Sequence, residues 1–473
     1  MKITRIICLA LACMLLCGGA LAESAVPPSD LTLPADLTVI DQRAFYGDTS
    51  IDRLIIPEGV RRIEANAFSN CNLSFVSLPE SLEYIAWNAF SGNEDMAVMV
   101  VKGSYAHEWA SDRAENFGPV VYAGQAFLPF SYTITSSGGT SAYATITRYF
   151  GAEPKAVIPD AVSIYPVTRV SRDAFSGNAD VVSVSIPSGV LTLGDSDLYS
   201  GGMHGSVLYG TFLNCPSLAE INVDAGSRFY HSIDGVLFKS SGLLRYPQAR
   251  PGDVYHIPED IHALFMNAFD GCSNLKELVL HENVSSIEPD ALMNAASLER
   301  ITVAEGNGTF SSADGALLGE SGTKLLIYPQ SKSDAGYVIP DSVTTIAESA
   351  FRGNPHLESI SFPSSLRTIS SSSFKNCTAL KEIVIPDGLT KIASGVFTGC
   401  TGLTRIQLPE TLTSIGWICF TDCPNLESVS LPASIESIGG ELFTGCPNVT
   451  VTVTEGSYAH EWCEANGVRY VFE

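Results

Sequence analysis

A phenylalanine returns every 23 residues in the last third of this chain, at Phe351, Phe374, Phe397, Phe420 and Phe443. A fixed period of this length is the signature of a solenoid, in which one short unit stacks on the next. Such a unit is too short to bury its own apolar face and depends on its neighbours for a core. The period therefore predicts a stacked repeat protein. Folds of this kind present long surfaces for binding more readily than pockets for chemistry.

Each unit contains a short apolar alternation that ends at a proline. In one unit Ile383 and Ile385 alternate with polar residues, and Pro386 follows. The alternation indicates a strand with one buried face, and proline ends the strand because it cannot donate to a ladder. Leu389 and Phe397 then fill the interior as the chain turns back. The pattern predicts short strands that stack side by side about 4.8 Å apart.

The segment from Ala268 to Leu280 reads Ala-Phe-Asp-Gly-Cys-Ser-Asn-Leu-Lys-Glu-Leu-Val-Leu. It resembles the repeat unit of the BspA-like leucine-rich repeats of bacterial exported and surface proteins. The resemblance covers most of the chain after its first residues. It implies a β-rich leucine-rich-repeat solenoid of curved, stacked, parallel short strands with turns and short helices, helical C-terminal caps and inserted β-hairpins. It also implies a role in adhesion to host proteins and to other cells.

Two nearly identical segments, residues 103–110 and 456–463, each follow a valine-rich strand. The spacing of their aromatic and small residues suits one face of a short helix. A solenoid needs such a cap because its last core layer would otherwise meet water, and the resembling family closes its arrays with this element. Two caps imply two arrays. A repeated cap also explains His107 and His460 better than a pair of metal ligands does.

These features predict the following organisation: a signal peptide at 1–22, a first leucine-rich-repeat array with its helical cap at 31–122, a β-hairpin opening segment at 127–170, a second array at 171–453 with two inserted hairpins, and a C-terminal cap at 454–473. The two Asp-Gly pairs at 234–235 and 314–315 mark the inserted hairpins, which we expect to project from the solenoid. The glycine-rich stretch 193–210 is expected to be a plain loop.

The first 22 residues read as a secretory signal, with a positive start, an apolar run and a small-residue cleavage site. The apolar run is shorter than the roughly 20 residues that a membrane span needs. Leu16 is bulkier than lipoprotein processing usually accepts, which argues against lipid anchoring at Cys17. We therefore expect a secreted or cell-surface protein without membrane insertion.

The formal net charge is −24. This excess of carboxylates argues against nucleic acid and against anionic membranes as partners, because both require a basic surface. No spaced Asp/Asn/Gly calcium loop is present. The charge is expected to serve the solubility of a long exposed surface.

Three of the twelve cysteines lie in the predicted signal peptide, and most of the other nine share one repeat position. Seven of them stand three residues after the aromatic: Cys71, Cys215, Cys272, Cys377, Cys400, Cys423 and Cys446. Asn93 and Asn354 fill the same position elsewhere, so it needs a small group that can bond the turning backbone. No paired Cys-x-x-Cys motif supports a metal site. We predict buried core thiols, and neither disulfides nor metal ligands.

Catalysis needs a nucleophile with a base, paired carboxylates in a cleft, or a metal. The sequence has no Gly-x-Ser-x-Gly elbow, no His-Glu-x-x-His motif and no phosphate loop. We therefore expect no enzyme and no cofactor.

Outward positions on the predicted strands form a polar stripe that is rich in hydroxyl groups. The candidate binding residues on this stripe are Arg300, Thr302, Ser359, Ser361, Glu382, Arg405, Gln407 and Ser428. Such a stripe suits the backbone of an extracellular protein or a glycan, although ordinary solvated strand surface explains any single residue equally well. The leading hypothesis is an exported binding or adhesion protein that presents its repeat surface to host or cell-surface proteins or glycans. The alternative is a structural spacer or envelope component without a specific ligand.

Overall fold

The computed structural model describes residues 29–34, 36–93, 96–113, 120–122, 129–137, 141–151, 153–162, 164–194 and 211–473. The predicted signal peptide, and the predicted loop 193–210 after its first two residues, lie outside these ranges. The chain divides into two compact units, residues 1–132 and 133–473. The domain boundaries expected from the sequence stay predictions. Within the described ranges, no helix is long and apolar enough to cross a membrane.

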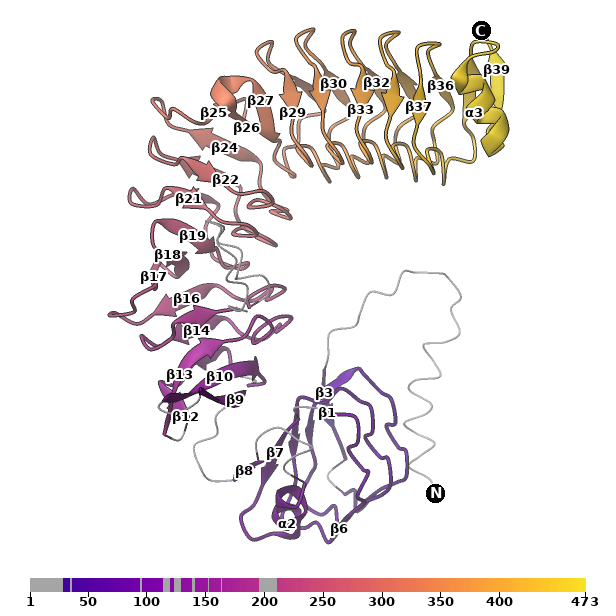
Figure 1. The fold of residues 1–473 in the computed structure, drawn as a ribbon. Coiled ribbons are helices and arrows are strands. Elements are labelled where there is room, and N and C mark those ends of the chain that lie inside the picture. The colour runs from indigo at the N-terminus through magenta and orange to yellow at the C-terminus, as the bar shows by residue number, and fades with distance from the viewer. Residues whose placement is uncertain are drawn as a thin grey trace. The chain divides into compact units, whose positions relative to one another are not determined.

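Unit 1 contains two parallel strand ladders that enclose one core (Figure 1). The first ladder runs in the order β1 (Ser29–Thr32), β3 (Ile51–Ile55), β5 (Phe75–Ser77), β7 (Ala97–Val100) and β8 (Val120–Tyr122). The second consists of β2 (Val39–Ile40), β4 (Arg62–Ile63) and β6 (Tyr84–Ile85). The first three coils each contribute one strand to each ladder, namely β1 and β2, β3 and β4, and β5 and β6.

A stack of aromatic rings runs through the core of unit 1. Phe45 stacks on Phe68 with ring centroids 5.0 Å apart, and Phe68 stacks on Phe90 at 5.4 Å. Helix α2 (Tyr105–Ser111) ends the stack, because Trp109 meets Phe90 edge-on at 5.8 Å. Ser104 caps this helix by accepting a hydrogen bond from the backbone N–H of His107. The helix therefore covers the last core layer, as a solenoid cap must.

Among the residues that the structure describes, the first part of unit 2 contains four sheets. One sheet has the order β12 (Ala161–Val162), β13 (Tyr165–Val170), β10 (Ser141–Tyr149) and β9 (Phe130–Ser137), and β15 (Thr192–Leu193) also pairs with β13. Two sheets have three strands each, in the orders β11 (Lys155–Val157), β14 (Ser183–Ile186), β16 (Glu220–Val223) and β20 (Val254–His256), β22 (Glu277–Leu280), β24 (Arg300–Val303). The sheet of the first hairpin has the order β17 (Tyr230–Ile233), β18 (Val236–Lys239), β19 (Gly242–Arg245), β21 (Ala263–Leu264) and β23 (Ser286–Ile287).

The second part of unit 2 contains three sheets. The longest sheet begins with the second hairpin and has the order β25 (Ser311–Ala313), β26 (Ala316–Gly319), β27 (Lys324–Ile327), β29 (Thr345–Ile346), β31 (Thr368–Ile369), β33 (Lys391–Ile392), β35 (Ser414–Ile415) and β37 (Ser437–Ile438). A short sheet pairs β28 (Gly336–Val338) with β30 (Ser359–Ser361). The last sheet has the order β32 (Glu382–Val384), β34 (Arg405–Gln407), β36 (Ser428–Ser430), β38 (Thr450–Val453) and β39 (Tyr470–Phe472). A 3₁₀ turn, η1 (Glu320–Gly322), joins β26 to β27. Helix α3 (Tyr458–Asn466) lies between β38 and β39 (Figure 1).

In the regular coils of unit 2 the strands are buried on alternate residues, as the sequence pattern predicts. In β32, Ile383 is buried while Glu382 and Val384 are exposed. A separate aromatic stack in unit 2 runs from Phe351 through the 23-residue series to Phe443. Trp462 of α3 meets Phe443 edge-on, with ring centroids 6.3 Å apart. The predicted leucine-rich-repeat solenoid, with helical caps and inserted hairpins, is confirmed.

The repeated cysteines link each coil to the one before it. The Cys377 thiol donates to the carbonyl oxygen of Phe351 at 3.1 Å, and Cys423 donates to that of Phe397 at 3.2 Å. At the same position Asn354 uses its Nδ2 to bond the carbonyl of Pro329 at 3.1 Å. All nine cysteines of the described ranges are buried and free, which agrees with the packing role predicted for them.

The inserted hairpins do not project from the solenoid, and this expectation was wrong. The pairs β17–β18 and β25–β26 are antiparallel. Each continues into β19 or β27, and these strands pair in parallel with the next coil of the ladder. The turns have the expected form, since Asp314 and Gly315 both have positive φ, 47° and 80°.

The physical reason is that the hairpin strands are apolar on both faces. In β26, Leu317 packs into the core that precedes the hairpin, whereas Ala316 and Leu318 pack into the core that follows it. A strand with two apolar faces would lose this burial if it projected into water. The second hairpin is therefore a partition that ends one core and begins the next.

Candidate binding surfaces

The strand face of β32, β34 and β36 brings four of the predicted residues together. Glu382 is in register with Arg405, and Arg405 is in register with Ser428. Gln407 lies two residues further along β34, beside Val384 of β32. All of these side chains are exposed. The result is a flat row in which opposite charges and hydroxyl groups stand on adjacent strands.

The other four predicted residues lie on different sheets. Ser359 and Ser361 belong to β30, which pairs only with β28 among the described strands. Arg300 and Thr302 belong to β24, at the edge of an earlier sheet. Thr302 is half-buried, and its hydroxyl donates to Oε1 of Glu277 at 2.6 Å. The predicted stripe is thus divided over three sheets, and its role in binding stays a prediction.

A second surface was missed by the sequence reasoning. A hollow of about 1060 Å³ opens along the ladder β27–β29–β31–β33. Its lining residues come from five successive coils, between residues 287 and 298, 317 and 330, 347 and 353, 367 and 376, and 390 and 393. This volume is at the upper end of the range of roughly 300–1,000 Å³ that is usual for small-molecule sites.

The hollow lies where the repeat departs from its own pattern. Twenty-three residues after Phe269 and Cys272 the chain has Leu292 and Ala295, so one aromatic ring and one thiol are missing from the stack. These smaller side chains leave space that the neighbouring coils do not refill. The two departures are visible in the sequence, and comparison of each unit with the consensus is the signal that would have found the site.

The first hairpin shows how the equivalent space is closed. There Arg245 stands in the place that Ile327 takes in the second hairpin, and it is buried. Its guanidinium donates to the carbonyl oxygens of Asn267 at 2.8 Å, Asp270 at 3.0 Å and Phe212 at 3.2 Å. Ile327 cannot make these bonds, and it lines the hollow.

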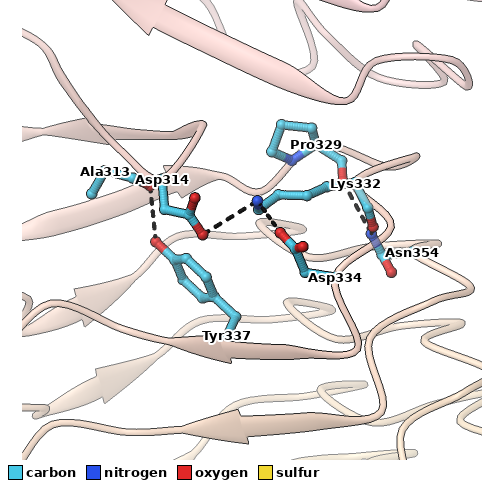
Figure 2. Close-up of polar contacts among 7 residues, drawn as sticks. All are labelled: Ala313, Asp314, Pro329, Lys332, Asp334, Tyr337 and Asn354. Carbon is cyan, nitrogen blue, oxygen red and sulfur yellow. Dashed lines mark hydrogen bonds and ion pairs between the residues drawn. The ribbon is translucent and has the colours of Figure 1, made fainter.

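A buried lysine fixes the second hairpin to the coil that follows it. Figure 2 shows the Nζ atom of Lys332 between the carboxylates of Asp314 and Asp334; the distance to Oδ2 of Asp314 is 3.3 Å. The Tyr337 hydroxyl donates to the carbonyl of Ala313 at 3.3 Å. Burial and the Asp314 charge raise the pKa of Tyr337 to about 12. These contacts hold the hairpin in its partition position.

The described residues offer little for catalysis. Burial raises the pKa of the Cys400 and Cys419 thiols to about 12, so they stay protonated and are poor nucleophiles. No group of three or more histidine, cysteine or acidic side chains within the described ranges could hold a metal ion. The histidines of the two caps serve the helix starts, where Nδ1 of His460 accepts from the backbone N–H of Gly456 at 3.1 Å. Surfaces for binding are what the architecture provides.

Solved structures of three bacterial proteins are similar to this chain. A leucine-rich cell surface protein of Faecalibacterium prausnitzii is 22% identical, with 72% of this chain and 96% of that one covered and a TM-score of 0.47. A leucine-rich-repeat protein of Eubacterium ventriosum is 18% identical, with 67% and 93% covered and a TM-score of 0.38. The pneumococcal vaccine antigen PcpA is 15% identical, with 94% of both chains covered and a TM-score of 0.39.

Among curated proteins, no sequence matches this chain. The family model described as "BspA type Leucine rich repeat region" matches it in six copies, over residues 24–105, 206–313 and 331–450. These segments make up more than half of the chain, and they include both the strand face and most of the hollow. The chain therefore belongs to the BspA-type leucine-rich-repeat family.

Proposed function

We propose that this protein is an exported binding protein that presents its exposed strand face to an extracellular protein or a glycan. The observation that carries the proposal is the row Glu382–Arg405–Ser428, which stands in register on three adjacent strands. Membership of a repeat family supports a role in binding, because stacked coils build an extended surface and no enclosed catalytic cleft. The adhesive role that the family resemblance implies is a proposal of the same kind.

The exposed strand face combines polar and apolar side chains. Val384 is 57% exposed and stands beside Gln407, and Val338 is 74% exposed and stands beside Ser361 of β30. Apolar side chains within a polar surface can be desolvated by a partner at little cost, and the neighbouring hydroxyl groups can bond its polar atoms. This mixture supports contact with a partner more than it supports a surface that serves solubility alone.

The export of the protein rests on the leader expected at residues 1–22, which the described ranges do not include. Fractionation of the producing cells tests it directly. Recovery of the protein in the medium or on the cell surface supports export, and recovery inside the cells contradicts it.

The binding proposal is tested by a screen of the purified protein against extracellular-matrix proteins and a glycan array. Binding at micromolar Kd or better, lost in the variant R405A, supports the strand face as the site. The matched control is R228A, which removes one exposed arginine outside the strand face. Equal loss in both variants would show a charge effect without a site. Binding to no member of the panel favours the spacer role.

A further inference from the structure

The hollow beside the second hairpin is long in the direction of the ladder. Strands β27, β29, β31 and β33 follow one another in parallel register, so three steps of about 4.8 Å separate the first from the last. The hollow also reaches back to Ile287 in the coil before the hairpin. An opening that crosses several coils fits a linear chain better than it fits a single small molecule.

The lining of the hollow has the mixed character that a sugar chain requires. Ile327, Leu326 and Met293 supply apolar surface, while Gln330 and Thr368 supply an amide and a hydroxyl group. Sugar rings carry hydroxyl groups around an apolar C–H face. Recognition of such rings therefore needs apolar contact and hydrogen-bonding side chains close together.

The charges of the lining favour a neutral ligand. Three carboxylates, on Glu288, Asp290 and Glu348, face four cations, on Lys324, Arg352, Arg367 and Lys391. The two signs nearly cancel, so the hollow has no strong preference for either kind of ion. The net charge of −24 on the whole chain also repels polyanions.

An exposed tryptophan stands one strand beyond the end of the hollow. Trp417 lies two residues after β35, the strand that pairs with β33, and its side chain is 64% exposed. Gly440 of the next coil makes room for its indole, since a Cβ there would lie 2.5 Å from the ring atom Cζ3. The backbone N–H of Trp417 donates to the hydroxyl of Ser394 at 3.2 Å. The indole is therefore held beside the ladder with much of its surface open to a ligand.

The residue after this tryptophan is conformationally costly. Ile418 has φ +52°, in the left-handed region that a β-branched side chain rarely adopts. Asn66, Asn267 and Gly395 occupy the equivalent position in other coils, and these residue types tolerate the region. Because Ile418 is itself exposed, burial does not offset its strain. Strain of this kind gathers at binding sites.

We propose that the hollow between residues 287 and 393 and the Trp417–Ile418 pair form one binding site for a neutral glycan chain. The chain lies along the ladder, with a sugar ring stacked on the Trp417 indole and the following rings in the hollow. This site is separate from the strand face, so either can fail without the other.

The test uses four neutral hexasaccharides as probes: cellohexaose, maltohexaose, hexa-N-acetylchitohexaose and mannohexaose. Isothermal titration calorimetry measures Kd, and tryptophan emission reports on the indole. We expect at least one probe to bind and to change the emission. W417A should weaken that binding about tenfold, which is the loss of one stacking contact. W87A is the matched control, because Trp87 is 75% exposed at the same repeat position in unit 1.

A second variant, I327R, tests the hollow independently of Trp417. Arg245 in the first hairpin shows that this fold accepts arginine at the equivalent position by bonding it to backbone carbonyls. I327R should therefore stay folded, with an unchanged circular dichroism spectrum. It should weaken hexasaccharide binding, because the arginine side chain fills the part of the hollow that Ile327 lines. Absence of binding by all four probes overturns the proposal. It is also overturned if W417A and I327R bind as the unmodified protein does, if W87A weakens binding as much as W417A, or if hyaluronan hexasaccharide binds more tightly than every neutral probe.

Discussion

The thiol of Cys400 donates a hydrogen bond to the carbonyl oxygen of Phe374, 3.1 Å away in the preceding coil. The bond repeats along the solenoid, and the same residue position also supports the aromatic stack. It explains why either Cys or Asn occupies this position, since both are small donors that reach a carbonyl oxygen of the preceding coil.

C400A should therefore lower the stability of the protein, because it removes the donor and leaves a buried carbonyl without this partner. We expect a loss of about 1 kcal/mol in the free energy of unfolding. C400N should lose less, since Asn354 already bonds two carbonyls from this position. Urea unfolding followed by circular dichroism gives the midpoints. An unchanged urea midpoint for C400A would show that this hydrogen bond does not contribute to stability.

The buried thiols also predict how stability depends on pH. Burial raises the pKa of Cys400 and Cys419 from 9.0 to about 12. The folded state thus favours the neutral thiol, so its contribution to stability is complete below about pH 9 and is lost as pH rises toward 12. Buried tyrosines such as Tyr337 act in the same direction.

Urea midpoints at about pH 8 and about pH 10.5 measure this loss. The control is the double variant C400N/C419A, chosen because Asn354 and Ala350 occupy the equivalent positions in another coil. Its midpoint should fall less between the two pH values than that of the unmodified protein. An equal fall in both proteins would assign the pH dependence to other groups.

Much of the fold follows from the sequence because one short pattern is repeated. The alternation around Ile383 predicts a strand wherever it recurs, and every copy reinforces the same register. The hairpins were misplaced for the opposite reason, since a local Asp-Gly turn does not reveal that Leu317 and Leu318 serve two different cores. Their neighbours are set by coils distant in sequence.

The surfaces were harder to predict than the fold. Arg300 and Arg405 look alike in the sequence, yet the second hairpin separates them into different sheets. The hollow depends on Leu292 and Ala295, which are smaller than the consensus residues of the repeat, and on Ile327, which is smaller than Arg245 of the first hairpin. The sequence shows the two departures from the consensus, but whether neighbouring side chains refill the space is seen only when the coils on both sides are placed.

The contacts of Lys332 predict that removing the lysine and removing its two carboxylate partners will destabilise the protein by different amounts. The lysine side chain is 8% exposed, whereas the Asp314 and Asp334 side chains are 66% and 52% exposed. K332M leaves two carboxylates that water can solvate, and we expect a cost of about 1 kcal/mol. D314N/D334N leaves a buried ammonium without its counter-ions, and a cost of about 3 kcal/mol is expected. Denaturant unfolding compares the two, and an equal or larger cost for K332M would contradict this account.

The two caps should differ in what they contribute. Trp109 is buried at the end of its stack, 4% exposed, whereas Trp462 is only partly buried against Phe443. W109A should therefore cost about 3 kcal/mol or more, the range for a buried aromatic, and W462A should cost about 1 kcal/mol. Amide hydrogen exchange locates the effect, because a solenoid transmits destabilisation chiefly to the adjacent coil. W462A should raise exchange in β37 and β38 and leave unit 1 unchanged. An equal increase in the amide exchange rates of both units would show that the caps do not act locally.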